Sequence, residues 1–193
     1  MAHEALIIVD VQNDFCPGGS LAVPHGDQVV DAINSWVAER ASDLLIVTTQ
    51  DAHPPNHVSF HAQGGPWPPH CVVGTWGFEL HPSLRVVPSA QFYKGSSPDV
   101  DAYSGFEGRL ASSPSVVPEK SVSLADFLHQ QNVVALYVAG LATDYCVKAT
   151  VLDALSLGFP TTVLLDGVRG VEVHPGDSQA ALDEMARQGA RLQ

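Results

Sequence analysis

The segment ALIIVD at residues 5–10 places five consecutive apolar residues directly before an aspartate. Short runs of this kind, rich in Val, Ile and Leu, are typical of strands that are buried on both faces of a sheet. Three further runs have the same character, at residues 44–49, 133–139 and 161–165. We therefore expect four core strands, and we expect them to be parallel.

The segments around these runs carry helical patterns. Apolar residues recur at helical spacing over residues 29–37, after the capping candidate Asp27, and over residues 149–155, after Thr143. Residues 178–188 predict a last helix on the same grounds. The alternation of strands and helices predicts an α/β fold: an open doubly wound sheet, mostly parallel, with helices on both faces.

Length and charge limit the organisation and the partners of the chain. A chain of 193 residues, 45% of them hydrophobic, can bury a sizeable core, and residues 1–193 are expected to form a single domain. The formal net charge of −12 would repel nucleic acid and an anionic membrane surface. With few cysteines, no apolar leader and no membrane-length apolar run, we expect a cytoplasmic protein. Whether it forms a homo-oligomer is left open.

One region, at about residues 51–88, fits neither the strand nor the helix pattern. It is crowded with Pro, Gly, His and Trp. A long irregular segment inside a compact domain is usually functional or disordered, and a disordered linker would hold few aromatic residues. We expect an ordered loop region that packs over a site.

Several chemically active side chains follow the predicted strands. In open α/β sheets, ligands bind outside the carboxyl ends of the strands. Asp10 ends the first run, Asp51 and His53 follow the second, Lys94 follows a short apolar segment, and Cys146 follows the run at 133–139. All of these groups are expected at the same edge of the sheet.

Cys146 is a candidate nucleophile, although a cysteine is often only a small buried hydrophobe. If Thr143 caps a helix, Cys146 lies in its first turn, where free amide groups and the helix dipole lower the thiol pKa. The same amides could hold an oxyanion. Cys16 and Cys71 lack this setting and are expected to be structural.

Asp10 and Lys94 have ordinary explanations when each is taken alone, as a turn cap and as a surface charge. Beside a cysteine, however, an aspartate can take the thiol proton and return it to a leaving amine. A lysine close to both would stabilise their ionised forms. Together, the three residues predict an acyl-transfer site.

A metal site is predicted from one carboxylate and two imidazoles, those of Asp51, His53 and His70. This ligand set suits a catalytic divalent metal with open positions for water or substrate. Zn²⁺ is the first candidate, and the sequence does not decide between it, Fe²⁺ and Mn²⁺. Each His could equally be an ordinary loop residue, and His57 as a further ligand is left open.

Six motifs, taken together, resemble those of the nicotinamidases, also called pyrazinamidases, within the isochorismatase-like cysteine hydrolases. They are VDVQNDFCPGGSLAV, QDAHPPNHVSF, WPPHCV, FYKG, AYSGFEG and GLATDYCV, in the order of that family. The resemblance implies a catalytic triad of Asp10, Lys94 and Cys146. It also implies metal ligation by the Asp51, His53 and His70 set, with His57 as the candidate for a further ligand.

The resemblance implies further features of the active site. It implies a cis peptide between Leu141 and Ala142, which would aim the backbone N–H groups of Ala142 and Cys146 at an oxyanion. The residues implied for the substrate pocket are Phe15, Trp67, Tyr103 and Leu141. Tyr145 is a departure, because some members carry His at this position beside the nucleophile.

The implied reaction is hydrolysis of nicotinamide, and of analogues such as pyrazinamide, to the carboxylic acid and ammonia through a cysteine thioester, in the recycling of nicotinamide toward NAD. Isochorismatases need no metal, so the predicted ligand set argues against them. Related amidohydrolases that act on N-carbamoyl or ureido compounds share the triad but generally lack this metal cluster. A catalytically silent binding protein would have a broken triad, whereas all three positions are filled here.

Overall fold

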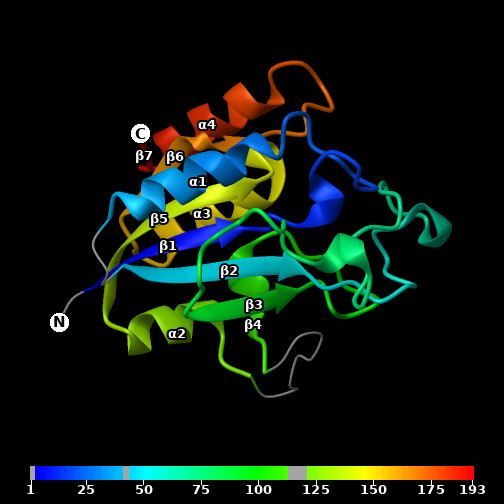
Figure 1. Ribbon diagram of the computed structural model, residues 1–193, viewed down its shortest axis with the longest axis horizontal. Coiled ribbons are helices and arrows are strands. Elements are labelled where there is room, and N and C mark those ends of the chain that lie inside the picture. Colours follow the sequence, from blue (N-terminus) through cyan, green and yellow to red (C-terminus); the bar gives the residue numbers. More distant parts are fainter. Residues whose placement is uncertain (1–2, 41–43, 113–120) are drawn as a thin grey trace.

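A seven-stranded open sheet forms the centre of the molecule (Figure 1). The computed structural model describes residues 3–40, 44–112 and 121–193. The strand order is β4-β3-β2-β1-β5-β6-β7, and all neighbouring strands are parallel except β3 and β4. The strands are β1 (His3–Val9), β2 (Leu45–Asp51), β3 (Ala90–Lys94), β4 (Arg109–Leu110), β5 (Val133–Leu141), β6 (Thr161–Arg169) and β7 (Arg191–Leu192). The mostly parallel sheet predicted from the sequence is confirmed, with Lys94 as the last residue of β3 and not beyond it.

Helices cover both faces of this sheet. Successive side chains of a buried strand point to opposite faces, so β1 contributes to two separate core clusters. Leu6 and Ile8 of β1 pack in one core cluster with α1 (Gln28–Ala38). Ile7 and Val9 pack in a second cluster with α2 (Leu124–Gln130), α3 (Lys148–Ser156) and α4 (Asp177–Arg187). The doubly wound arrangement is therefore confirmed.

Of the two expected helix caps, the position of Asp27 is confirmed and that of Thr143 is wrong. Asp27 occupies the N-cap position of α1, but its side chain makes no capping hydrogen bond. Thr143 lies inside a helical turn whose N-cap is Ala142. That turn, Thr143–Val147, is a π-helix, because the N–H of Val147 donates to the carbonyl of Ala142, five residues back, at 3.0 Å. Cys146 therefore lies in a wide turn that precedes α3.

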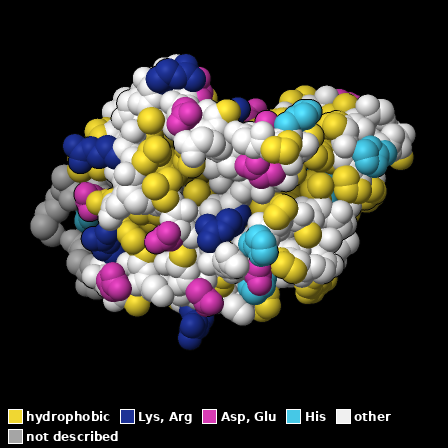
Figure 2. Space-filling view, turned by 90° about the horizontal axis from the view of Figure 1, so that it is seen from above, with side chains coloured by type: hydrophobic (Ala, Val, Ile, Leu, Met, Phe, Trp, Pro, Cys, Tyr) yellow, Lys and Arg dark blue, Asp and Glu magenta, His cyan; other side chains and the backbone are white. Residues whose placement is uncertain are grey.

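The region at residues 51–88 is irregular, as expected. Its helical content is two short 3-10 turns, His61–Gln63 and Trp76–Phe78. In Figure 1 the arrowheads of β2 and β3 point toward the teal loops of this region, which lie at the carboxyl edge of the sheet. Figure 2 keeps the same horizontal axis and shows histidine and hydrophobic side chains gathered at that end. Among the described residues, no helix combines the length and the apolar character needed to cross a membrane.

Gly140, near the end of β5, is required by the close approach of β1. Its φ is +120°, and an added Cβ would lie 2.0 Å from the carbonyl oxygen of Val9. We expect Gly140→Ala to lower the free energy of unfolding by about 3 kcal/mol or more, because backbone strain adds to a clash that no rotamer can relieve.

Gly158 provides a matched control for this prediction. Its φ is +86°, and an added Cβ would meet nothing within 4 Å. Gly158→Ala is therefore expected to cost only about 1 kcal/mol, from strain alone. Urea denaturation of both variants measures the two losses, and equal losses would show that the contact with β1 is unimportant.

Candidate active site

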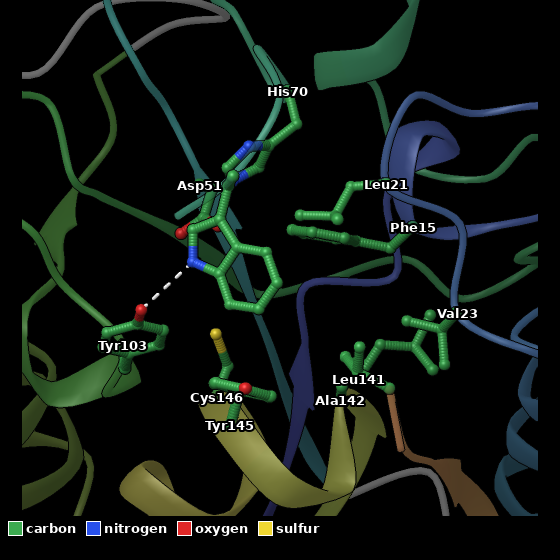
Figure 3. A pocket seen from close by; sticks show the side chains of 12 residues that line it. Phe15, Leu21, Val23, Asp51, His70, Tyr103, Leu141, Ala142, Tyr145 and Cys146 are labelled. Carbon is green, nitrogen blue, oxygen red and sulfur yellow. Dashed lines mark hydrogen bonds and ion pairs between the residues drawn. The ribbon is translucent and has the colours of Figure 1, made fainter. Parts of the chain in front are cut away.

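The carboxyl edge of the sheet brings together the side chains that the sequence singled out. Asp10 directly follows β1 with a φ of +49°, Asp51 ends β2, and Lys94 ends β3. Cys146 comes from the π-helical turn after β5. Figure 3 shows the sulfur of Cys146 pointing into a pocket between Tyr103 and Phe15.

Lys94 connects the expected triad. Its Nζ lies 2.9 Å from Oδ2 of Asp10 and 3.5 Å from Sγ of Cys146. A carboxylate oxygen of Asp10 and the sulfur of Cys146 lie within 4.8 Å of each other. The second oxygen of Asp10 accepts a hydrogen bond of 2.7 Å from the Thr49 hydroxyl. Asp10 is therefore oriented from one side, and its other oxygen faces lysine and thiol.

Burial controls the protonation of these groups. It raises the pKa of the Cys146 thiol well above its ordinary value; Lys94 opposes this, and the carboxylates of Asp10 and Asp51 add to it. The expectation of a lowered thiol pKa is thus wrong, because desolvation dominates at this depth. Burial also raises the pKa of Asp10, against the opposing effect of Lys94. A protonated thiol beside a carboxylate of raised basicity suits proton transfer from sulfur to Asp10.

Lys94 itself remains charged. Burial alone would lower its pKa, but the adjacent carboxylates of Asp10 and Asp51 outweigh this effect and raise it well above the ordinary value. Nζ forms an ion pair with Oδ1 of Asp51 in addition to its contact with Asp10. The lysine therefore compensates two buried carboxylates.

Asp51, His53 and His70 converge as the sequence predicted. Oδ2 of Asp51 lies 3.5 Å from Nε2 of His53 and 3.9 Å from Nε2 of His70. Nδ1 of His53 donates to the carbonyl of Gly95, and Nδ1 of His70 donates to that of Pro68, both at 2.8 Å. These bonds leave Nε2 of each ring on the side of the Asp51 carboxylate, where it could ligate a metal ion, and metal-ligating histidines are commonly held in this way.

The last position of the FYKG motif, Gly95, requires a residue without a side chain. Its φ is +61°, and an added Cβ would lie 2.5 Å from the ring of His53. Glycine therefore allows the carbonyl of residue 95 to reach the imidazole.

His57 lies outside this cluster of ligand atoms. Its ring stacks on that of His53, with centroids 3.9 Å apart. Nδ1 contacts the Ser59 hydroxyl at 2.7 Å, and Nε2 contacts the carbonyl of Val100 at 3.2 Å. Because a carbonyl only accepts, Nε2 carries the proton, and both ring nitrogens are engaged. Two groups among the described residues have ligand atoms close enough to hold a metal ion. One consists of Asp51, His53 and His70, and the other of Asp10, Asp51 and Cys146.

A pocket opens above Cys146, with about 380 Å³ of empty space that includes open solvent at its mouth. The four residues expected in the substrate pocket lie in its wall, together with Ala142 of the expected oxyanion hole: Phe15, Trp67, Tyr103 and Leu141. Tyr145, noted in the sequence as a departure from the family pattern, also lines the pocket. Sequence reasoning missed three further wall residues, because they are ordinary apolar residues in loops and turns: Leu21, Val23 and Val171. The wall is predominantly apolar, and its polar groups, including Asp51, His70 and Cys146, lie on one side (Figure 3).

Aromatic side chains hold one another in this wall. The indole N–H of Trp67 donates to the hydroxyl of Tyr103 at 3.2 Å. The ring of Tyr145 makes an edge contact with Trp67, with centroids 5.2 Å apart, and lies 5.9 Å from the ring of Tyr103. The departure at position 145 therefore places a second tyrosine against the indole beside the nucleophile.

The other two cysteines lie in the core, as expected. Cys16 and Cys71 are buried in the same hydrophobic cluster, on the α1 face of the sheet. Burial and the nearby Asp27 raise the pKa of Cys16 to about 11. Burial also raises the pKa of Cys71 well above its ordinary value. Neither thiol lines the pocket above Cys146, so both are expected to be unreactive toward a substrate bound there.

The chain is similar to known proteins over its full length. The Isochorismatase domain family matches residues 4–193. Nicotinamidase of Escherichia coli (strain K12) is 44% identical over 213 residues, covering 100% of this chain and 95% of that protein. The crystal structure of a pyrazinamidase of Pyrococcus horikoshii in complex with zinc has a TM-score of 0.85 and 41% identity, covering 99% of this chain and 98% of that chain. A structure from L. infantum in complex with nicotinate has a TM-score of 0.86 and 37% identity, covering 100% of this chain and 92% of that chain.

The family resemblance inferred from the six motifs is thus confirmed over the full length of the chain. The chain belongs to the isochorismatase family, and within it to the nicotinamidase/pyrazinamidase hydrolases.

Proposed function

We propose that the protein hydrolyses nicotinamide, and analogues such as pyrazinamide, to the carboxylic acid and ammonia through a thioester on Cys146. The observation that carries this proposal is the contact of one buried lysine, Lys94, with both Asp10 and Cys146 at the base of an apolar pocket. The similar L. infantum structure, which contains nicotinate, supports a product of this size and chemistry.

Acylation begins with proton transfer from the Cys146 thiol to Asp10. Sγ then attacks the carboxamide carbon, and the backbone N–H groups of Ala142 and Cys146 stabilise the negative charge that forms on oxygen. The tetrahedral intermediate collapses by breaking the C–N bond, and Asp10 returns its proton to the departing nitrogen. The products of this half-reaction are ammonia and the Cys146 thioester.

Deacylation uses the same carboxylate again, first as a base and then as an acid. Asp10 takes a proton from a water molecule, and the hydroxide so formed attacks the thioester carbon. The C–S bond breaks, the sulfur recovers the proton from Asp10, and the carboxylic acid leaves. Lys94 keeps its charge throughout and stabilises whichever of the two neighbours is ionised.

The aromatic ring of the substrate is proposed to lie between Phe15 and Trp67, with Tyr103 and Leu141 completing the wall. The ring faces of these side chains favour a flat, neutral, aromatic ligand over a charged one, because an ion would lose its hydration there. Since the nucleophile works only as a reduced thiol, we place the enzyme in a reducing compartment such as the cytoplasm.

Asp51, His53 and His70 are proposed to hold one divalent metal ion. The donor set fits, since it combines one carboxylate with two imidazoles whose Nδ1 atoms are already bonded to carbonyls. Zn²⁺ is the best-supported ion, because a similar pyrazinamidase structure contains zinc. When bound, the ion supplies a Lewis-acid site that orients the substrate ring through its nitrogen or a bound water.

The metal assignment predicts that His70→Ala weakens zinc binding by about 100-fold or more, since one of three ligands is lost. Competition with a chromogenic chelator measures this affinity without reference to turnover. The control is His61→Ala, an exposed histidine of the same loop region, which is expected to bind zinc within about threefold of the parent protein. Equal affinity in the His70 variant and the parent would exclude His70 as a ligand.

The reaction itself is tested by ammonia release from nicotinamide and pyrazinamide with folded, zinc-loaded protein. Turnover of either amide supports the proposal. Turnover confined to N-carbamoyl or ureido compounds would assign the site to the related amidohydrolases, and the absence of turnover of either amide overturns the proposal.

A further inference from the structure

Gln12 completes the sheet at the point where β1 ends. The last backbone bond between the two central strands runs from the N–H of Asp10 to the carbonyl of Thr49, at 3.1 Å. The chain then turns away at Asp10, whereas β2 continues to Asp51. The backbone groups of Asp51 on that side therefore have no strand to pair with.

The side chain of Gln12 takes the place of the missing strand. Its Oε1 accepts from the N–H of Asp51 at 2.9 Å, and its Nε2 donates to the carbonyl of Asp51 at 2.8 Å. Nε2 also donates to the carbonyl of Phe78 at 2.9 Å. The side chain is fully buried, at 0% exposure, so these hydrogen bonds are shielded from bulk water.

Asp51 contacts the expected catalytic triad through Lys94 and also belongs to the proposed metal site. One oxygen of its carboxylate pairs with Lys94, and the other faces His53 and His70. The direction of the carboxylate follows from the position of its backbone. A shift of the backbone at Asp51 would therefore move the carboxylate away from both imidazoles together.

We propose that Gln12 is a positioning residue that fixes Asp51 for metal binding through paired hydrogen bonds to its backbone. The inference rests on the metal site proposed above. Gln12 does not touch the ion; it acts through Asp51, as outer groups that hold metal ligands do. Without it, the buried N–H and carbonyl of Asp51 lose their partners, and the end of β2 must move to satisfy them.

The test compares Gln12→Met with Gln50→Met. Both parent side chains are buried glutamines that donate to the carbonyl of Phe78, at 2.9 and 3.0 Å, but only Gln12 also binds the backbone of Asp51. Methionine keeps the approximate length and removes the hydrogen bonds. Zinc affinity is measured by chelator competition, and the free energy of unfolding of the metal-free proteins is measured in urea.

Gln12→Met is expected to weaken zinc binding by about 10- to 100-fold, and Gln50→Met by less than about threefold. A purely structural role predicts instead that both variants lose zinc affinity in proportion to their loss of stability, and that result overturns the proposal. Unchanged zinc affinity in a folded Gln12→Met also overturns it. If Gln12→Met does not fold, Gln12→Glu keeps the volume and the acceptor for Asp51 but loses at least one of the two donated hydrogen bonds, and it is expected to bind zinc about 10-fold more weakly than the parent.

Zinc binding by the parent protein distinguishes a failure of this proposal from a failure of the metal assignment. Zinc binding by the parent with no difference between the variants contradicts only the positioning role. A parent that takes up no zinc contradicts the metal site, and the role of Gln12 falls with it.

Discussion

Cys146→Ala is expected to lower kcat/KM for nicotinamide by about 10⁴-fold or more, because no other group in the pocket can form the thioester. Cys146 is buried, but the substitution removes only a single sulfur atom, so the cavity is small and the fold should persist. Ammonia release over a range of nicotinamide concentrations, with saturating zinc, measures the loss in kcat/KM. Circular dichroism and zinc content are expected to match those of the parent protein.

Cys16→Ala is the matched control, since Cys16 is also a buried thiol but lies in the hydrophobic cluster on the α1 face. It is expected to keep turnover within about threefold of the parent while losing a small amount of stability. Iodoacetamide should modify Cys146 in the parent and leave Cys16 intact. Persistent turnover in Cys146→Ala would exclude covalent catalysis by this residue.

Asp10→Asn is expected to lower kcat by about 10³-fold, because an amide cannot accept the thiol proton or return it to ammonia. The substitution is isosteric and keeps an oxygen for the Thr49 hydroxyl, which now bonds Asp10 at 2.7 Å. Initial rates with nicotinamide over a range of substrate concentrations separate the loss in kcat from any change in KM.

Alkylation of Cys146 distinguishes the loss of the base from damage to the site. In the proposed mechanism Asp10 takes the proton of this thiol, so the Asp10→Asn variant is expected to react with iodoacetamide more slowly than the parent at neutral pH. Raising the pH is expected to restore alkylation, because hydroxide then removes the thiol proton. Alkylation at the parent's rate at neutral pH would contradict the role of Asp10 as a base, and no alkylation at raised pH would indicate a disrupted site.

The amino-acid sequence by itself determined the class of the fold and the edge at which the chemistry lies. Apolar runs such as residues 5–9 mark buried parallel strands because burial on both faces permits few polar residues. Since parallel strands end at one edge, Asp10, Asp51 and Cys146 could be assigned to one site before any contact was known. The motif set then gave the type of reaction.

The local helix signals were less informative. Thr143 has the side chain of a cap, yet the cap is Ala142 and the turn is a π-helix, because this turn is shaped by the end of β5 and not by local preference. The thiol pKa was mispredicted for a related reason. Desolvation depends on everything packed around Cys146, and sequence spacing does not contain that information.

Only the tertiary structure decided which groups touch. Lys94 meets Asp51 across 43 sequence positions and Cys146 across 52, and Gln12 meets Asp51 across 39. It also assigned His57 to Ser59 and Val100 and placed Tyr145 against Trp67. The physical reason is that hydrophobic periodicity specifies which side chains are buried, whereas hydrogen-bond partners, charge compensation and ring contacts depend on distances of a few ångström that exist only once the strands and loops are packed.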